Sequence, residues 1–318
     1  MSRPSFTLEA SRHKIHLGEH TLVMGVLNVT PDSFSDGGLY LDANSAVEHG
    51  LEMMRQGADW IDVGGESTRP GSKPVPPDVE LARVLPVIRG LHRRAPALAI
   101  SIDTTKSDVA DQAIRAGASI INDVSGLRFD PQVAMVARRQ RAPLVLMHMR
   151  GRPETMQQPP FARSIARSLG RGLAESIREA VRRGVRPSQL IIDPGLGFGK
   201  TRRQNFEIIA ALSRLRRFGL PLLVGASRKS FVQTVAAGEG LDPARQPAKM
   251  RTRQGPWKLV KAGLPIDAEA LRVLQIGDAA AVTAAILGGA HIVRVHEVAA
   301  IMPAVRIADA VLAARRGL

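Results

Sequence analysis

The sequence predicts an α/β fold in which eight parallel strands form a (β/α)8 TIM barrel, and two observations carry this prediction. Eight short apolar runs alternate with segments of helical spacing along a chain of 318 residues. Each apolar run also stops on a polar or charged residue, although burying a charge costs several kcal/mol unless it has a partner. Parallel barrel strands all end on one face, so these polar ends predict a single shared site there.

The apolar runs end on residues that suit ligand binding better than packing. In chain order they are Asn28, Glu66, Asp103, Asn122 with Asp123, His148, Asp193, Lys229, and Arg294 with His296. Strand and helix alternate to the end of the chain, which favours parallel strands with crossover helices. An open doubly wound sheet is the alternative, but no G-x-G-x-x-G pattern follows the first run.

The segments between the runs have the apolar spacing of amphipathic helices. They cover residues 46–58, 78–93, 107–118 and 165–184, and a further helix is expected to start near Asp278. Three helices end in Gly-Ala directly before a strand, at Gly57, Gly117 and Gly289. Glycine can take the left-handed conformation that stops a helix, so these pairs mark the helix ends.

One stretch, about 238–275, departs from the alternation because it is rich in proline, glycine and basic residues. It is too short to bury a core of its own, so we interpret it as an insertion in the seventh βα crossover. The chain at 1–318 is then one barrel domain. The insertion is either a solvated loop or a flap over the site.

Composition limits the possible functions. Cysteine is absent, which excludes disulfides, thiolate metal sites and thiol catalysis. The net charge of +15 would suit either a nucleic-acid surface or a site for a small anionic substrate. The arginines are dispersed and aromatic residues make up 3% of the chain, so no nucleic-acid partner is expected. No run resembles a signal peptide or reaches membrane-spanning length, which predicts a cytoplasmic protein without a membrane partner.

Two loops are longer and more polar than minimal connections, at 28–38 and 64–71. Their threonine, proline, aspartate and serine residues would also suit simple turns that cap the next helix. Two such loops above one barrel mouth favour a functional role.

Asp103, Asn122 and Asp193 end three strands and together could hold a flat heterocycle. A carboxylate accepts from an N–H and an amino group side by side, and asparagine both donates and accepts. Asp103 could instead cap the following helix. A metal site is the third alternative, and it is less favoured because no histidine and carboxylate cluster has ligand spacing.

The remaining candidates suit phosphates and rings. The segment at 193–201 resembles a P-loop, but Pro194 stands where that motif needs its first glycine, so nucleotide hydrolysis is rejected. Its Phe198 could form a wall for a ring. Arg294 and His296 lie two apart on a strand and face the same side, where they could bind a diphosphate with the basic segment at 227–230.

Taken in order, these motifs resemble the dihydropteroate synthase family from about Thr21 to Val298. They read NVTPDSFSDGG, DVGGESTRPG, SIDT, INDVSG, MHM, DPGLGFGK, SRKS and RVH. The resemblance implies a barrel, usually homodimeric, that joins 6-hydroxymethyl-7,8-dihydropterin diphosphate to 4-aminobenzoate in folate biosynthesis with Mg2+. It also implies a dissociative mechanism, in which the diphosphate leaves before the arylamine attacks.

The resemblance assigns roles to residues by position. The pterin pocket would be lined by Asp103, Asn122, Met147, Asp193 and Lys229. The diphosphate would be held by Asn28, Arg294 and His296, with Asn28 also on Mg2+. The 4-aminobenzoate site would be formed by Phe34, Thr68, Arg69, Pro70, Phe198 and Ser230. Catalysis would then rest on Asn28, Asp103, Asp193, Lys229, Arg294 and His296.

Two features depart from the family pattern. Asp278 stands where many members have threonine or serine, although others have aspartate. The insertion is also unusually long, and we hypothesise that it overhangs the 4-aminobenzoate entrance and alters discrimination among analogues such as sulfonamides. The alternative functions are a methyltetrahydrofolate methyltransferase, a barrel that binds pterin without catalysis, and a nucleic-acid binder.

Overall fold

The structure is a computed structural model and describes residues 3–10, 13–30, 43–68, 71–159, 161–238, 240–241 and 268–315. Three predicted site residues, Phe34, Arg69 and Pro70, lie outside these ranges, as does most of the predicted insertion at 238–275.

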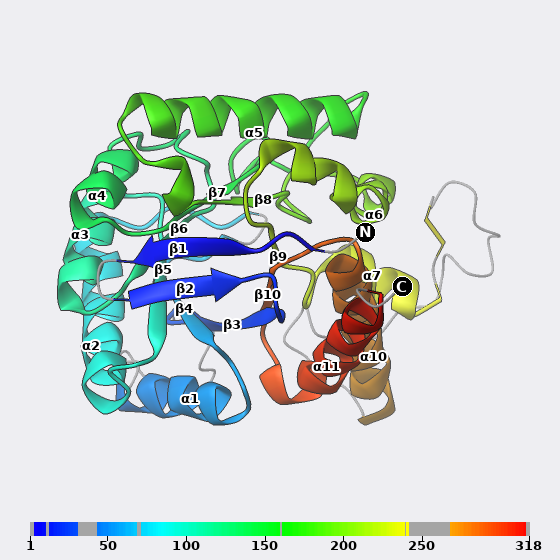
Figure 1. The fold of residues 1–318 in the computed structure, drawn as a ribbon, viewed down its shortest axis with the longest axis horizontal. Coiled ribbons are helices and arrows are strands. Elements are labelled where there is room, and N and C mark those ends of the chain that lie inside the picture. Colours follow the sequence, from blue (N-terminus) through cyan, green and yellow to red (C-terminus); the bar gives the residue numbers. More distant parts are fainter. Residues whose placement is uncertain are drawn as a thin grey trace.

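Eight parallel strands form the barrel that the sequence predicts (Figure 1). In chain order they are β3 (Leu22–Asn28), β4 (Trp60–Gly64), β5 (Ala99–Asp103), β6 (Ile120–Asp123), β7 (Leu144–Met147), β8 (Leu190–Asp193), β9 (Leu223–Val224) and β10 (Ile292–Val295). The hydrogen-bonded order runs β8-β7-β6-β5-β4-β3-β10-β9. Between β8 and β9 the ring is joined by one parallel bridge, Ile192 to Leu222, where Ile192 N–H also donates to Pro221 O at 3.0 Å.

Helices surround the strands in the predicted alternation. They are α1 (Ala43–Arg55), α2 (Pro77–Arg94), α3 (Ser107–Ala116), α4 (Val133–Gln140), α5 (Ile165–Arg182), α6 (Arg202–Ala210), α7 (Ser230–Ala236), α10 (Ala268–Leu287) and α11 (Val298–Ala314), with 3-10 turns η2 (Pro187–Gln189) and η3 (Leu212–Phe218). The predicted helical segments agree with α1, α2, α3 and α5 to within a few residues. Gly57, Gly117 and Gly289 have φ values of 109°, 127° and 109°, as predicted for helix-stopping glycines.

The main correction concerns α10. The sequence predicted its start near Asp278, but the helix begins at Ala268, inside the segment that we interpreted as an insertion. The apolar residues at 271–276 have helical spacing, and their position after a long basic segment hid this pattern.

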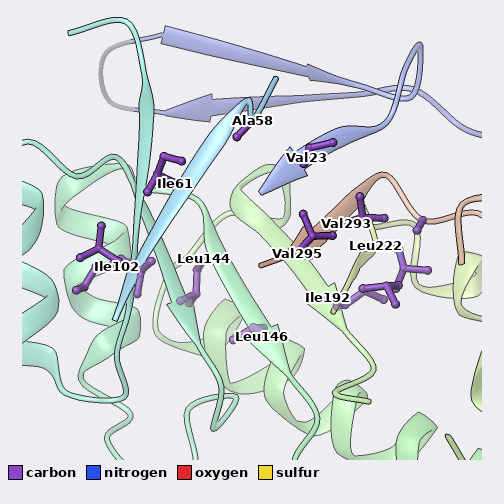
Figure 2. Close-up of a cluster of buried hydrophobic side chains, with 14 of the residues drawn as sticks. Val23, Ala58, Ile61, Ile102, Leu144, Leu146, Ile192, Leu222, Val293 and Val295 are labelled. Atoms are coloured by element: carbon purple, nitrogen blue, oxygen red, sulfur yellow. The ribbon is translucent and has the colours of Figure 1, made fainter. Parts of the chain in front are cut away.

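The outer core lies between the barrel and its helices. Alternate strand residues such as Ile61, Ile102, Leu144, Ile192 and Val293 are fully buried and form one cluster with the inner faces of the helices (Figure 2). This alternation follows from the two-residue period of a strand, which sends neighbouring side chains to opposite faces.

The inner core fills the end of the barrel at which the strands begin. The inward residues of the first layer, including Met24, Trp60 and Ile191, pack against an antiparallel hairpin of β1 (Phe6–Ala10) and β2 (His13–Leu17). Arg3 fixes this end, since its buried guanidinium donates to Thr21 Oγ1 at 2.6 Å and pairs with Asp309 of α11 at 3.3 Å. The hairpin therefore closes this end of the barrel (Figure 1).

The α10 helix also corrects the expectation that no run reaches membrane-spanning length. Among the residues that the structure describes, it is the one helix long and apolar enough to cross a membrane by length and composition. It packs against α7 and α11 at the side of the barrel (Figure 1). About a third of this apolar segment is buried inside the protein, and the helix exposes Leu271 and Ile276.

Candidate functional site

Strand register brings the predicted polar ends into one layer at the mouth of the barrel. Asn28 pairs with Gly64, Gly64 with Asp103, and Asp103 with Asn122 across three neighbouring strand pairs. On the other side of the ring, Met147 pairs with Asp193. All of these residues share the inward parity of the apolar layer below them, so the barrel interior changes from apolar to polar towards its mouth.

Gly64 leaves the space in which two of these side chains meet. A Cβ atom at this position would lie 3.7 Å from Asp103 Oδ2 and 3.8 Å from Asn28 Oδ1. The glycine therefore lets an amide oxygen and a carboxylate lie close together above β4.

Arg294 is the electrostatic centre of the site. Its Nε donates to Asp62 Oδ2 at 2.6 Å, and its Nη2 donates to Asp103 Oδ2 at 2.8 Å. The Asp62 side chain is fully buried, that of Asp103 is 6% exposed, and that of Arg294 is 18% exposed. One guanidinium thus compensates two carboxylates that could not remain ionised in this environment alone.

Burial shifts the acid–base behaviour of the mouth. Burial raises the pKa of Asp103. The Arg294 charge acts to lower this pKa, and the nearby Asp62 carboxylate acts to raise it. Burial also raises the pKa of Asp193 to about 6, against the lowering effect of Lys229. Burial and the Arg294 charge together lower the pKa of Lys229 to about 8. The mouth therefore holds charges whose protonation a bound ligand can change.

Among the described residues, two carboxylate oxygens of this layer are buried without a hydrogen-bond partner. They are Oδ1 of Asp62 and Oδ1 of Asp103. Asn122 Nδ2 donates to Asp62 Oδ2 at 2.9 Å, which turns the Asn122 amide oxygen the other way. Because unpartnered buried acceptors are costly, the layer is suited to a ligand that presents N–H groups.

The loop after β8 is shaped by its lysine. Lys200 Nζ donates to the carbonyl oxygens of His148, Gly195 and Phe198 at 3.0, 2.7 and 3.0 Å. The lysine of this P-loop-like segment thus binds protein carbonyls. The loop presents Phe198, whose ring centroid lies 4.2 Å from Lys229 Nζ.

The last strand contributes His296 next to the turn before α7. Ser227 Oγ lies 3.3 Å from His296 Nδ1 and accepts from the His296 backbone N–H at 3.3 Å. Thr68 lies on the loop after β4, and Ser230 is the first residue of α7. Neither residue takes part in the ion pairs of Arg294.

Three polar strand ends do not face the mouth, which corrects the idea that all of them converge there. His148 packs against α5, where a Cβ atom at Gly172 would lie 2.6 Å from its ring. Asp123 accepts from the backbone N–H groups of Ser125 and Leu127 at 2.8 and 2.6 Å. Both residues have outward strand parity, so they stabilise loops outside the barrel.

Glu66 is the third such residue. It accepts from Lys106 Nζ at 2.5 Å and from Val75 N–H at 3.0 Å, and Lys106 Nζ also donates to the buried Glu80 at 2.5 Å. The carboxylate therefore anchors the loop after β4 instead of lining the mouth.

Asp62 is the site residue that the sequence argument missed. Asp62 lies in the middle of an apolar run whose polar end is Glu66. The alternation of the strand could have identified Asp62, because this residue lies between Trp60 and Gly64 and shares their inward parity. A carboxylate facing the interior of a barrel requires a buried cation, which Arg294 supplies.

The described residues contain no group of three or more histidine, aspartate or glutamate side chains that could hold a metal ion. A metal in this mouth would therefore depend on few protein ligands and on oxygen atoms of a substrate.

Comparison with known proteins agrees with the geometry. The family model described as "Pterin binding enzyme" matches residues 24–296. The chain is 41% identical to a dihydropteroate synthase of Synechocystis over 293 residues, which is 92% of this chain and 91% of the relative.

Two solved structures of the Xanthomonas albilineans dihydropteroate synthase are also similar. The one with 4-aminobenzoic acid has a TM-score of 0.79 at 37% identity and covers 98% of this chain and 99% of its own. The one with 7,8-dihydropteroate has a TM-score of 0.75 at 35% identity, with 96% and 99% covered. The chain therefore belongs to the pterin-binding enzyme family and, within it, to the dihydropteroate synthases.

Proposed function

We propose that this enzyme condenses 6-hydroxymethyl-7,8-dihydropterin diphosphate with 4-aminobenzoate to give 7,8-dihydropteroate and diphosphate. The observation that carries the proposal is the joint placement of buried acceptors and cations at one barrel mouth. Asp103, Asn122 and Asp193 suit a pterin ring, and Arg294 beside them suits a diphosphate. Met147 and Phe198 supply apolar surface for the ring, since they lie in one small cluster at this end.

The pterin is held through its polar edge. The Asp193 carboxylate accepts from a ring N–H and the adjacent amino group, while the Asn122 amide and the second oxygen of Asp103 complete the pocket. The Lys229 ammonium lies over the Phe198 ring and donates to an acceptor atom of the pterin ring. The raised pKa of Asp193, about 6, still leaves it mainly ionised at pH 7.

The diphosphate is held by Arg294, His296 and Asn28. In the free protein Arg294 is paired with Asp62 and Asp103, so a diphosphate competes with these carboxylates for the same guanidinium. The Asn28 amide oxygen beside the Asp103 carboxylate is the kind of hard donor that Mg2+ takes in small number when phosphates fill its other positions. When bound there, Mg2+ would supply charge neutralisation for the leaving diphosphate.

The reaction follows from this distribution of charge. The C–O bond to the diphosphate breaks first, and the electron pair leaves with the diphosphate towards Arg294 and His296. The cation on the methylene carbon is delocalised into the pterin ring and stabilised by the Asp103 and Asp193 carboxylates. The neutral amine of 4-aminobenzoate then attacks the methylene carbon, forms the C–N bond and loses a proton to the released diphosphate. No strong general base is required, because the nitrogen proton becomes acidic once the C–N bond has formed.

The second substrate is assigned to the edge of the mouth. The proposed 4-aminobenzoate site takes Thr68 and Phe198 from loops and Ser230 from the start of α7, and Phe34, Arg69 and Pro70, outside the described residues, complete it. These substrates are small and soluble, as expected for a cytoplasmic enzyme.

A homodimer is proposed on the side of the barrel formed by α10 and α11. Four of the seven exposed large hydrophobic side chains among the described residues lie on these two adjacent helices: Leu271, Ile276, Ile307 and Val311. Ile276 and Ile307 are 62% and 66% exposed. Concentrated exposed apolar surface is typical of protein interfaces, and a second copy of the chain is the partner that the family resemblance implies.

Turnover with defined substrates tests the proposal. Purified protein is incubated with the pterin diphosphate, 4-aminobenzoate and Mg2+, and dihydropteroate and diphosphate are measured together. We expect both products in equal amounts. Pterin binding without product would instead favour a binding protein, and methyl transfer from methyltetrahydrofolate would favour the methyltransferase alternative.

A further inference from the structure

Asp278 of α10 reaches the turn that precedes α7. Its Oδ2 atom accepts two hydrogen bonds, from Ser227 Oγ at 3.0 Å and from the Arg228 backbone N–H at 2.8 Å. The side chain is buried, with 7% exposed. One carboxylate oxygen thus anchors the turn that carries Lys229 into the mouth.

The position of this carboxylate is fixed by packing. At the preceding residue, Gly277, a Cβ atom would lie 2.6 Å from the Cβ of Ala236 in α7, so α10 and α7 are in close contact. The anchored turn is also strained, because Arg228 has φ 55° without being glycine. Such conformations cost roughly 1–3 kcal/mol and persist where the surroundings enforce them. Arg228 is held on its other side by a 2.6 Å ion pair with Glu297.

The hydrogen bonds of Ser227 determine the protonation of His296. A hydroxyl donates one hydrogen and accepts two. Burial raises the pKa of Asp278 only to about 6, so the carboxylate is mainly ionised at pH 7 and takes the Ser227 hydrogen. The His296 backbone N–H occupies one lone pair at 3.3 Å. The second lone pair of Ser227 Oγ faces His296 Nδ1 at 3.3 Å, so Nδ1 must carry a hydrogen to complete this bond.

We propose that Asp278 is a positioning residue that acts through Ser227 to hold Nδ1 of His296 as a hydrogen-bond donor, so that a second proton on Nε2 gives the imidazolium that donates to the diphosphate. The site role of His296 rests on the proposed function, whereas the Nδ1 donor rests on the hydrogen bonds of Ser227. Asp278 touches no substrate. Without it, the Ser227 hydroxyl would donate to Nδ1, and the hydrogen of a neutral imidazole would move to Nε2.

The first experiment reads the tautomer directly. Protein labelled with 15N-histidine is compared at pH 8 as wild type, Asp278→Ala and Asp278→Asn, with His296→Gln used to assign the resonances. We expect Nδ1 to be protonated in wild type and Nε2 in Asp278→Ala. The Asn variant should keep the wild-type tautomer, because its amide oxygen can accept both hydrogen bonds. An unchanged His296 tautomer in a folded Asp278→Ala protein would overturn the proposal.

Two further variants separate the relay from general loss of a buried group. Ser227→Ala keeps the bond between Asp278 and the Arg228 backbone but removes the hydroxyl, so His296 should lose its fixed tautomer. Asp123→Ala is the matched control, since Asp123 is also buried and accepts from the Ser125 and Leu127 N–H groups at 2.8 and 2.6 Å outside the mouth. A change in His296 in this control equal to that in Asp278→Ala would contradict a specific relay.

The second experiment measures binding of inorganic diphosphate with Mg2+ by calorimetry. Exchange of the imidazolium for a neutral Nε2–H donor predicts about tenfold weaker binding in Asp278→Ala and recovery in Asp278→Asn. Equal affinity in all three proteins would overturn the role of the relay in diphosphate binding. A protein that makes no dihydropteroate but shows the predicted tautomers would reject the proposed function and retain the relay.

Discussion

At the scale of single residues, the mouth combines charges that binding requires and folding disfavours. Asp193 is the clearest case, since it is 5% exposed and burial raises its pKa to about 6. In the unfolded chain its pKa is near 3.8, so the unfolded state ionises first as pH rises. The ionised Asp193 therefore opposes folding, with no effect below about pH 4 and the full effect above about pH 6.

Asp193→Asn should consequently stabilise the protein while impairing its function. The amide keeps an oxygen for the Gly195 N–H, which donates to Asp193 Oδ1 at 2.6 Å, and removes the buried charge. We expect roughly 2 kcal/mol of added stability at pH 7, disappearing towards pH 4, and about hundredfold weaker pterin binding. Urea unfolding at several pH values and pterin titration measure the two effects.

A matched control for this prediction is Asp123→Asn. Burial also raises the pKa of Asp123 to about 6, but this carboxylate faces a loop outside the barrel. The Asp123→Asn variant should leave the pterin dissociation constant unchanged. Lower stability of Asp193→Asn at pH 7 than at pH 4, relative to wild type, would contradict the argument.

The residues of the site were predictable to the extent that strand parity determines them. Asp103, Asn122, Asp193 and Arg294 all lie at inward positions near strand ends, and the structure brings them together. His148 was assigned to the mouth incorrectly because its place after an apolar run was considered without its parity. Following Met147, which faces inward, it had to face outward.

At the scale of elements, the loop after β4 depends on residues from three parts of the chain. Lys106 stands at the start of α3, Glu66 in the loop and Glu80 in α2, and the two carboxylates share the Lys106 ammonium. No local pattern relates these three residues, so their contact could not be predicted from the sequence. The parallel barrel brings them together because β4 and β5 are neighbours in the sheet.

Lys106→Met should displace the loop that carries the proposed 4-aminobenzoate residues. The change leaves the fully buried Glu80 and the loop residue Glu66 without their cation, and Glu66 also holds the Val75 backbone. We expect a rise of about tenfold or more in the KM for 4-aminobenzoate, with pterin binding changed much less. Steady-state kinetics with each substrate varied in turn measure this difference.

The control for the loop prediction is a surface ion pair elsewhere. Glu48→Gln removes the exposed partner of Arg94 and should change neither KM. If folded Lys106→Met protein had an unaltered KM for 4-aminobenzoate, the ion-paired cluster would not position that loop.

At the scale of the whole molecule, α10 connects two surfaces. One side carries Gln275 and Asp278, which bind Glu297 at 2.7 Å and the turn before α7. Another side exposes Ile276, between these two residues in sequence. A partner bound to the exposed side would therefore restrain the same helix that holds the diphosphate end of the site.

Charge placed on this surface should separate the proposed dimer. Ile276→Glu combined with Ile307→Glu exchanges two exposed apolar side chains for carboxylates on adjacent helices, and a two-fold interface would bring four such charges together. Because both positions are more than 60% exposed, the barrel itself should fold normally. Sedimentation should show dimers for the wild type and monomers for the double variant, with little change in circular dichroism.

Met135→Glu, another exposed apolar position but on α4, is the control and should leave the mass unchanged. A wild type that sediments as a monomer at micromolar concentration would reject the dimer, and dimers in the double variant would place the interface elsewhere.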